Sequence, residues 1–142
     1  MRNYSIGNEG IVIHNLFECI GYTSGTAVEH DTSGYSNLKA LQDDGKLFVV
    51  PLTKQMIMPF EDDEQVDVLS LNCRGGEYWH LKDMKMRPRV IAVAYNKNLG
   101  NDRYITMPRG KSWDGKSDYY GASFPALQYQ RAGHKSEGNE IH

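Results

Sequence analysis

The chain has 142 residues, of which 39% are hydrophobic and 24% are charged, and its net charge is −2. This length suffices for one buried core, and the balanced composition excludes global disorder. No apolar run approaches the ~20 residues of a membrane helix, and the amino terminus lacks the apolar region of a signal peptide. Two cysteines are too few for a disulfide framework or a four-thiolate zinc site. We therefore expect a cytoplasmic protein with reduced thiols, one domain over 1–130, and no membrane partner.

The first third of the chain favours helices. Apolar residues recur at helical spacing within 6–21, and Gly21 is suited to end that helix. The stretch 22–35 is rich in Ser, Thr and Gly, which is typical of a loop. Ser36 then caps a short helix that continues through Gln42.

From residue 46 onward the pattern changes to short strands separated by turn residues. The longest run of strand-favouring and small apolar residues, 90–95, is followed by a turn-rich loop and by a second short run at 104–107, so 84–110 is predicted to form a hairpin. Further strands are predicted at 47–50, 56–58, 66–71 and 78–81.

These elements predict an α+β fold, with N-terminal helices packed on a mainly antiparallel sheet of four to six strands over 46–107. The reason is that no helix in the pattern is long enough for repeated βαβ crossovers. Residues 131–142 carry almost no apolar side chain to bury, so we expect a flexible C-terminal tail there.

The two halves of the chain differ in charge. Residues 1–73 hold four basic and eleven acidic residues, whereas residues 74–142 hold twelve basic and seven acidic ones. This polarity suits a basic face that attracts phosphates, or two faces that pair copies of the chain head to tail as a homo-oligomer. It also arises by chance, since folding mixes the halves.

Aromatic and basic residues alternate between 78 and 120, and this pattern is the basis of the main functional hypothesis. Arginine and lysine neutralise phosphates and tyrosine and tryptophan stack on bases, so we expect a non-enzymatic protein that binds nucleic acid or a nucleotide. The same side chains could instead anchor a host protein, or simply face solvent on a half-exposed sheet. The candidate ligand-binding residues are Tyr78, Trp79, Arg87, Arg89, Arg103, Tyr104, Arg109, Lys111 and Trp113.

An enzymatic alternative depends on His14 and Glu18, which are four residues apart and would share one face of a helix. With His80 they could act as acid, base or metal ligands in a small hydrolase or nuclease. No other catalytic motif is present, and the sequence implies no cofactor. In type, though not in any motif, the chain resembles the accessory proteins that phages and mobile elements encode to bind and inhibit a host factor.

Overall fold

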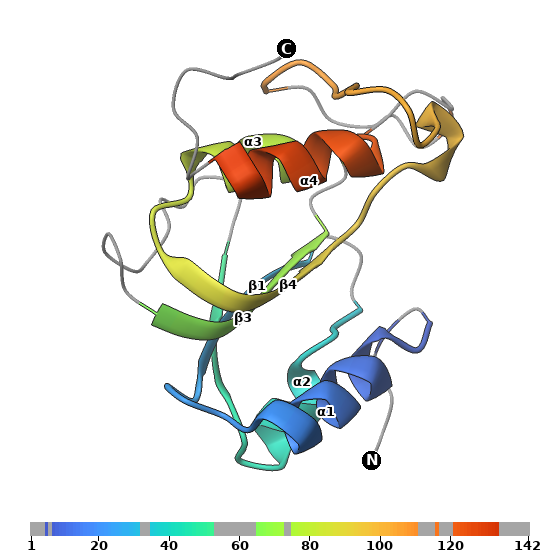
Figure 1. Ribbon diagram of the computed structural model, residues 1–142. Coiled ribbons are helices and arrows are strands. Elements are labelled where there is room, and N and C mark those ends of the chain that lie inside the picture. Colours follow the sequence, from blue (N-terminus) through green and yellow to red (C-terminus); the bar gives the residue numbers. More distant parts are fainter. Residues whose placement is uncertain are drawn as a thin grey trace. The chain divides into compact units, whose positions relative to one another are not determined.

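The computed structural model describes two compact units of the chain (Figure 1). Unit 1 consists of Met1–Leu71 with Lys85–Val93, and unit 2 consists of Asn72–Met84 with Ala94–His142. The expectation of one domain over 1–130 stays a prediction. The residues that the structure describes are 5, 7–31, 35–52, 65–72, 75–110, 116 and 121–133.

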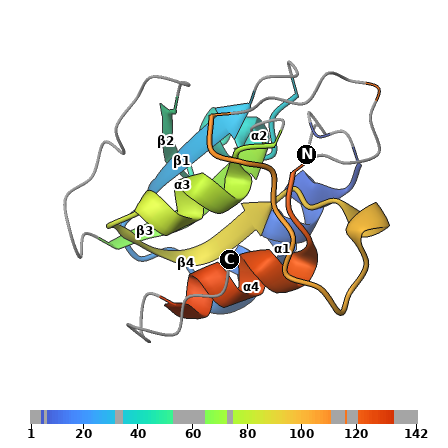
Figure 2. The ribbon, with the colours of Figure 1, turned by 90° about the horizontal axis from the view of Figure 1, so that it is seen from above.

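Unit 1 is built on a four-stranded sheet in which all strands are parallel, in the order β2-β1-β3-β4 (Figure 2). Thr26 of β1 pairs with Phe48 of β2, and Gln65 of β3 pairs with Arg87 of β4, so all four strands begin at the same edge. The strands are β1 (Thr26–Asp31), β2 (Phe48–Pro51), β3 (Gln65–Asn72) and β4 (Arg87–Val93).

The expected α+β fold with a mainly antiparallel sheet is therefore wrong. The predicted loop 22–35 contains β1, and the predicted strand 78–81 lies inside helix α3 (Glu77–Asp83). The predicted hairpin does not form, because β4 pairs with β3 and Thr106 instead makes an isolated antiparallel bridge with Ala122. The prediction was wrong because it took the short helices to exclude parallel crossovers. A parallel crossover needs a connection of a dozen or more residues, and the connections that contain the short helices α2 and α3 meet this need.

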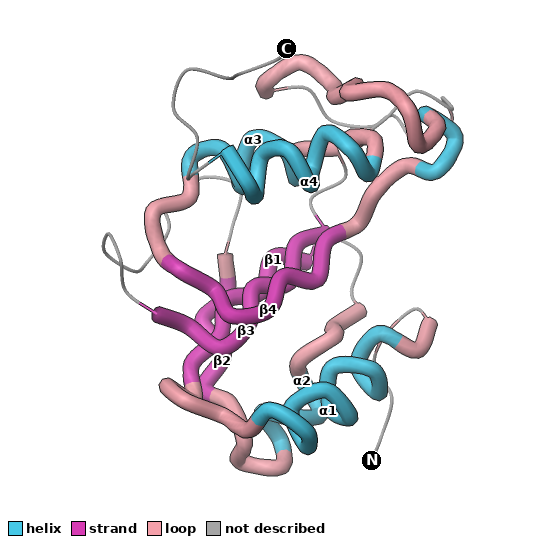
Figure 3. Tube along the Cα trace, in the orientation of Figure 1, coloured by secondary structure: helices cyan, strands magenta, loops and turns pink. Residues whose placement is uncertain are grey.

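Two helices, α1 (Glu9–Ile20) and α2 (Lys39–Asp43), lie on one side of the strands in unit 1 (Figure 3). The predicted first helix is confirmed, and Gly21 ends it with a φ of +73° that favours glycine. The helix predicted after Ser36 is present, but its N-cap is Leu38, which has no side-chain cap. The Ser36 hydroxyl precedes the helix and accepts hydrogen bonds from the N–H groups of Leu38 and Lys39. The apolar core of this layer is formed by Ile13, Phe17, Ala27, Leu38, Leu41, Leu47 and Val68.

Unit 2 contains helix α3, the 3-10 helix η1 (Lys97–Leu99) and helix α4 (Phe124–Gly133), and α3 contacts α4. Ser123 is a buried hub of this unit: its hydroxyl donates to the Arg103 carbonyl and accepts from the N–H groups of Ile105 and Ala126. Gly75 has a φ of +116°, and a Cβ there would lie 2.6 Å from the Met107 sulfur, so only glycine fits.

Several sequence predictions fall on residues that the structure does not describe. Helix α4 continues to Gly133 and so enters the predicted tail 131–142, of which 134–142 lie outside the described residues. The predicted strand 56–58 and Cys73 also lie outside them. Among the helices that the structure describes, none has the length and apolar character needed to cross a membrane.

Candidate functional site

The side chains that the sequence predicts to form one phosphate-binding face are divided between unit 1, unit 2 and the residues that the structure does not describe. Arg87 and Arg89 lie at the start of β4 in unit 1, and Lys111 and Trp113 lie outside the described residues. The hairpin that was expected to bring the candidates together does not form. Their role in binding therefore stays a prediction without its original structural basis. The remaining candidates belong to unit 2 and are Tyr78, Trp79, Arg103, Tyr104 and Arg109.

Within unit 2, three of these candidates are engaged in local packing. Tyr78 is buried and its ring meets Trp79 edge to face. The Arg109 guanidinium lies 4.6 Å from the Trp79 ring and donates to both carboxylate oxygens of Asp83, at 2.6 and 3.2 Å. Hydrogen bonding to Asp83 raises the pKa of Arg109. Arg103 and Tyr104, by contrast, are exposed.

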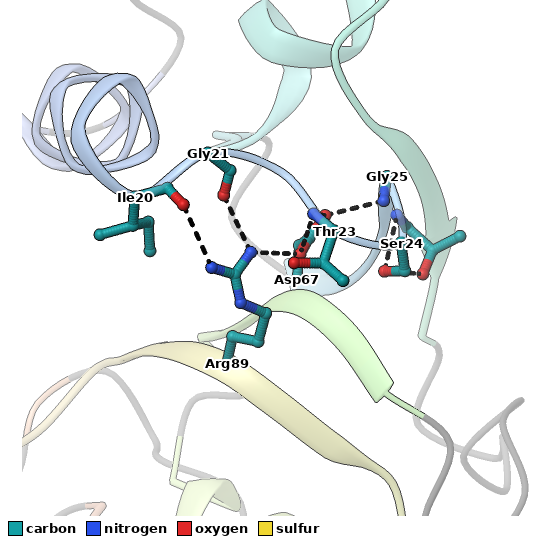
Figure 4. A network of polar contacts seen from close by, with 8 residues as sticks. Ile20, Gly21, Thr23, Ser24, Gly25, Asp67 and Arg89 are labelled. Carbon is teal, nitrogen blue, oxygen red and sulfur yellow. Dashed lines mark hydrogen bonds and ion pairs between the residues drawn. The ribbon is translucent and has the colours of Figure 1, made fainter.

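The amino edge of the sheet in unit 1 carries a polar network around Asp67 and Arg89 (Figure 4). Asp67 is fully buried on β3 and accepts hydrogen bonds from the N–H groups of Thr23 and Gly25. Arg89 on β4 donates to Asp67 at 2.8 Å and to the Gly21 carbonyl at 2.9 Å. The network therefore attaches the loop between α1 and β1 to two neighbouring strands.

The Asp67 carboxylate is stabilised in its charged form. Burial by itself would raise its pKa, but hydrogen bonds from the Arg89 side chain and from the N–H groups of Thr23 and Gly25 outweigh burial. The positive charge of Arg89 acts in the same direction, so the pKa of Asp67 is held below its ordinary value. Asp67 and Arg89 bond to each other and to backbone groups of residues 20–25, which indicates a structural role.

A second polar cluster lies at the opposite, carboxyl edge of the same sheet. Glu29 pairs with Pro51, the last residue of β2, and Ser70 pairs with Ala92 near the end of β4. The Glu29 carboxylate accepts hydrogen bonds from the Ser36 hydroxyl and from the Asn37 N–H. The Asn37 side-chain amide donates to the Ser70 hydroxyl at 3.1 Å. We call Glu29, Ser36, Asn37 and Ser70 the carboxyl-edge cluster.

The connections of the strands place this cluster at a switch point of the sheet. In the strand order β2-β1-β3-β4, the connection that leaves β1 leads to β2 at one end of the sheet, and the connection that leaves β3 leads to β4 at the other end. In open α/β sheets, ligands bind outside the carboxyl ends of two adjacent strands whose connections diverge in this way. Glu29 and Ser70 belong to those two strands, β1 and β3.

The carboxyl-edge cluster is acidic. Among the described residues, no lysine or arginine forms an ion pair with Glu29, and its partners are neutral donors. The basic residues Arg87 and Arg89 lie at the amino edge, at the start of β4. The half-buried Glu29 carboxylate and Asn37 side-chain oxygen suit hydroxyl or amine groups of a ligand. Ser70 is buried, and its hydroxyl holds the Asn37 side-chain amide in place. Phosphates, in contrast, would meet a carboxylate to which the described part of the chain supplies no cation.

The residues of the enzymatic alternative are only partly brought together. The His14 imidazole lies 3.7 Å from the Glu18 carboxylate on α1, and the Glu18 side chain is 61% exposed. His80 belongs to α3 in unit 2. The part of the chain that the structure describes contains no group of three or more His, Cys, Asp or Glu side chains that could hold a metal ion. The predicted helical pairing of His14 with Glu18 is thus present, as an ordinary surface contact. Cys19 on α1 is exposed.

Sequence reasoning missed both polar networks of unit 1. Asp67 had a usable signal, because a single carboxylate inside the apolar run of 66–71 must find a partner if the run is a buried strand. Glu29 had none, since β1 itself was read as part of a loop. Comparison of the chain with protein-family models, with curated proteins and with solved structures finds no match to any of them.

Proposed function

We propose that unit 1 binds a small nucleoside-bearing molecule over the carboxyl ends of β1 and β3, where the Glu29 carboxylate and the Asn37 side chain contact its hydroxyl groups. The observation that carries the proposal is the coincidence of a polar, acidic cluster with the switch point of a parallel sheet. In sheets of this class an acidic side chain near a strand end commonly accepts hydrogen bonds from ribose hydroxyls.

The charge of the cluster narrows the ligand class. A phosphate group beside the Glu29 carboxylate would cost at least ~1 kcal/mol for two like charges about 4 Å apart, even with the full screening of water. A neutral or positively charged nucleoside avoids this cost. We therefore favour a ligand with few or no phosphates, in place of the phosphate-rich partner expected from the sequence.

Calorimetric titration with a series of adenosine compounds that differ in charge tests this proposal. The series is S-adenosylmethionine with a net positive charge, neutral adenosine, AMP and ATP. We expect affinity to fall in that order, with AMP and ATP each at least about fivefold weaker than adenosine. Affinity that rises with the number of phosphates, or no binding of any compound at millimolar concentration, would contradict the proposal.

Two serine replacements localise the binding. Ser70→Ala removes the buried hydroxyl that accepts from the Asn37 side-chain amide, and the loss of this positioning hydrogen bond of ~1 kcal/mol should weaken adenosine binding about fivefold. Ser24→Ala is the matched control, because Ser24 precedes β1 at the amino edge and its hydroxyl bonds to neighbouring Thr26. Equal effects of the two replacements would place the ligand elsewhere.

A further inference from the structure

The large apolar side chains exposed in the described part of unit 2 are all aromatic. Tyr95, Tyr104 and Phe124 are 49%, 49% and 42% exposed. Unit 1 differs, because most of its exposed large apolar side chains are aliphatic and lie on α1, as Val12 and Ile20 do. Exposed aromatic rings offer flat faces for stacking, which aliphatic side chains lack.

Both exposed tyrosines of unit 2 are supported by a ring of helix α4. Tyr95 contacts Phe124, with 5.4 Å between the ring centroids and 54° between the planes. Tyr104 contacts Tyr129 edge to face, with 5.9 Å between the centroids and 81° between the planes. Each ring is therefore held in place on one side while about half of its surface faces solvent, so little rotamer freedom remains to be lost on binding.

A basic side chain accompanies each of these tyrosines in the chain. Lys97 follows Tyr95 by two residues, and Arg103 directly precedes Tyr104. Both are exposed, and neither forms an ion pair with any described residue. Arg109 differs from both, because it is paired with Asp83. Unit 2 as a whole has nine basic and seven acidic residues, against seven and eleven in unit 1.

We propose that the exposed aromatic and basic side chains of unit 2 (Tyr95, Lys97, Arg103, Tyr104 and Phe124) bind single-stranded nucleic acid. The tyrosine rings stack on bases, and Lys97 and Arg103 neutralise phosphates of the backbone. A nucleic acid fits better than a protein partner, because each supported ring comes with a cation that forms no ion pair with a described acidic side chain. A single acid, Asp102, lies between these cations in the sequence and leaves the group with a net positive charge. The proposal does not depend on ligand binding by unit 1.

Fluorescence anisotropy with a labelled 20-residue oligothymidylate tests the stacking. Tyr104→Ala should weaken binding roughly tenfold at every salt concentration, because loss of a stacking ring carries no counterion effect. Tyr35→Ala is the matched control: Tyr35 is 51% exposed and belongs to unit 1, so its removal should leave binding unchanged. An equal loss in both variants would overturn the proposal.

The salt dependence of the same titration tests the cation and does not require removal of a packed ring. Arg103→Ala should lower the slope of log affinity against log salt by about 0.7, the value for one phosphate contact on a single strand. Lys46→Ala, an exposed cation of unit 1, should not change the slope. If the wild-type protein fails to bind the oligonucleotide at low salt, or if Arg103→Ala leaves the slope unchanged, these side chains of unit 2 do not bind nucleic acid and a protein partner is the better explanation.

Discussion

The two edges of the parallel sheet in unit 1 each hold a carboxylate, and the two carboxylates differ in their hydrogen-bond and charge partners. At the amino edge, buried Asp67 is paired with Arg89 and receives backbone N–H groups from the loop that precedes β1. At the carboxyl edge, half-buried Glu29 receives a hydroxyl and one N–H but no cation from the described residues. The Asp67 charge is therefore neutralised within the fold, whereas no described residue supplies a cation to Glu29, which we propose as a ligand contact.

This difference suggests a structural role for the carboxylate at the amino edge and the proposed binding role for the carboxylate at the carboxyl edge. A buried ion pair with a full set of hydrogen bonds fixes the register of the elements that it joins, and removing one partner leaves the other uncompensated. An acid that keeps lone pairs and a negative charge near a switch point contributes less to stability and more to recognition. Replacements of Asp67 and Glu29 test whether the two edges differ in their contributions to stability and to ligand binding.

Replacement of Asp67 should have the largest effect. Asp67→Asn keeps the size of the side chain but leaves Arg89 without its counter-charge, so we expect the free energy of unfolding to fall by about 3 kcal/mol. Urea denaturation followed by circular dichroism measures this change. Asp44→Asn replaces an exposed acid of the same unit and should change the free energy of unfolding by less than about 0.5 kcal/mol.

The stability that Asp67 contributes should depend on pH in a defined direction. Because its folded-state pKa is lowered, the contribution is complete above the ordinary pKa of about 3.9 and is lost as pH falls through the folded-state value. The difference in unfolding free energy between the wild-type protein and Asp67→Asn should therefore stay constant above about pH 5 and shrink below about pH 4. A difference that grows on acidification would show that the carboxylate is not stabilised by Arg89.

Replacement of Glu29 should have the smallest effect on folding. Glu29→Gln removes the charge but keeps an oxygen that can accept from Asn37, so the free energy of unfolding should fall by less than about 1 kcal/mol. The same variant should lose preference for S-adenosylmethionine over ATP, because the repelling carboxylate is gone. A loss of stability as large as that of Asp67→Asn would mean that both edges are structural, and the comparison between them would fail.

The extent to which the sequence predicts this molecule varies between elements for physical reasons. Helix α1 was predictable, since its apolar spacing and its terminal Gly21 are local signals that tertiary contacts reinforce. Strand β1 was not, because its six residues include two carboxylates and a histidine and its apolar part is very short. Its strand form depends on pairing with β2 and β3, which is a long-range effect.

The candidate site was less predictable than the fold. Arg89 was identified as functional from its charge, yet it is engaged with Asp67, because a sequence shows that a charge exists but not what neutralises it. Arg103 and Tyr104 were identified together and remain neighbours on an exposed surface. The carboxyl-edge cluster could not be foreseen, because it joins residues from β1, β3 and the loop before α2 that only the strand order brings together.

Mapping of amide chemical shifts during titration with adenosine tests the central claim most directly, because it reports where on the sheet a ligand binds. The account predicts saturable shifts at the amides of Glu29, Asn37 and Ser70, and unchanged signals at Thr23, Gly25 and Arg89. Saturable shifts centred on the amino edge, with none at Glu29 and Ser70, would contradict it.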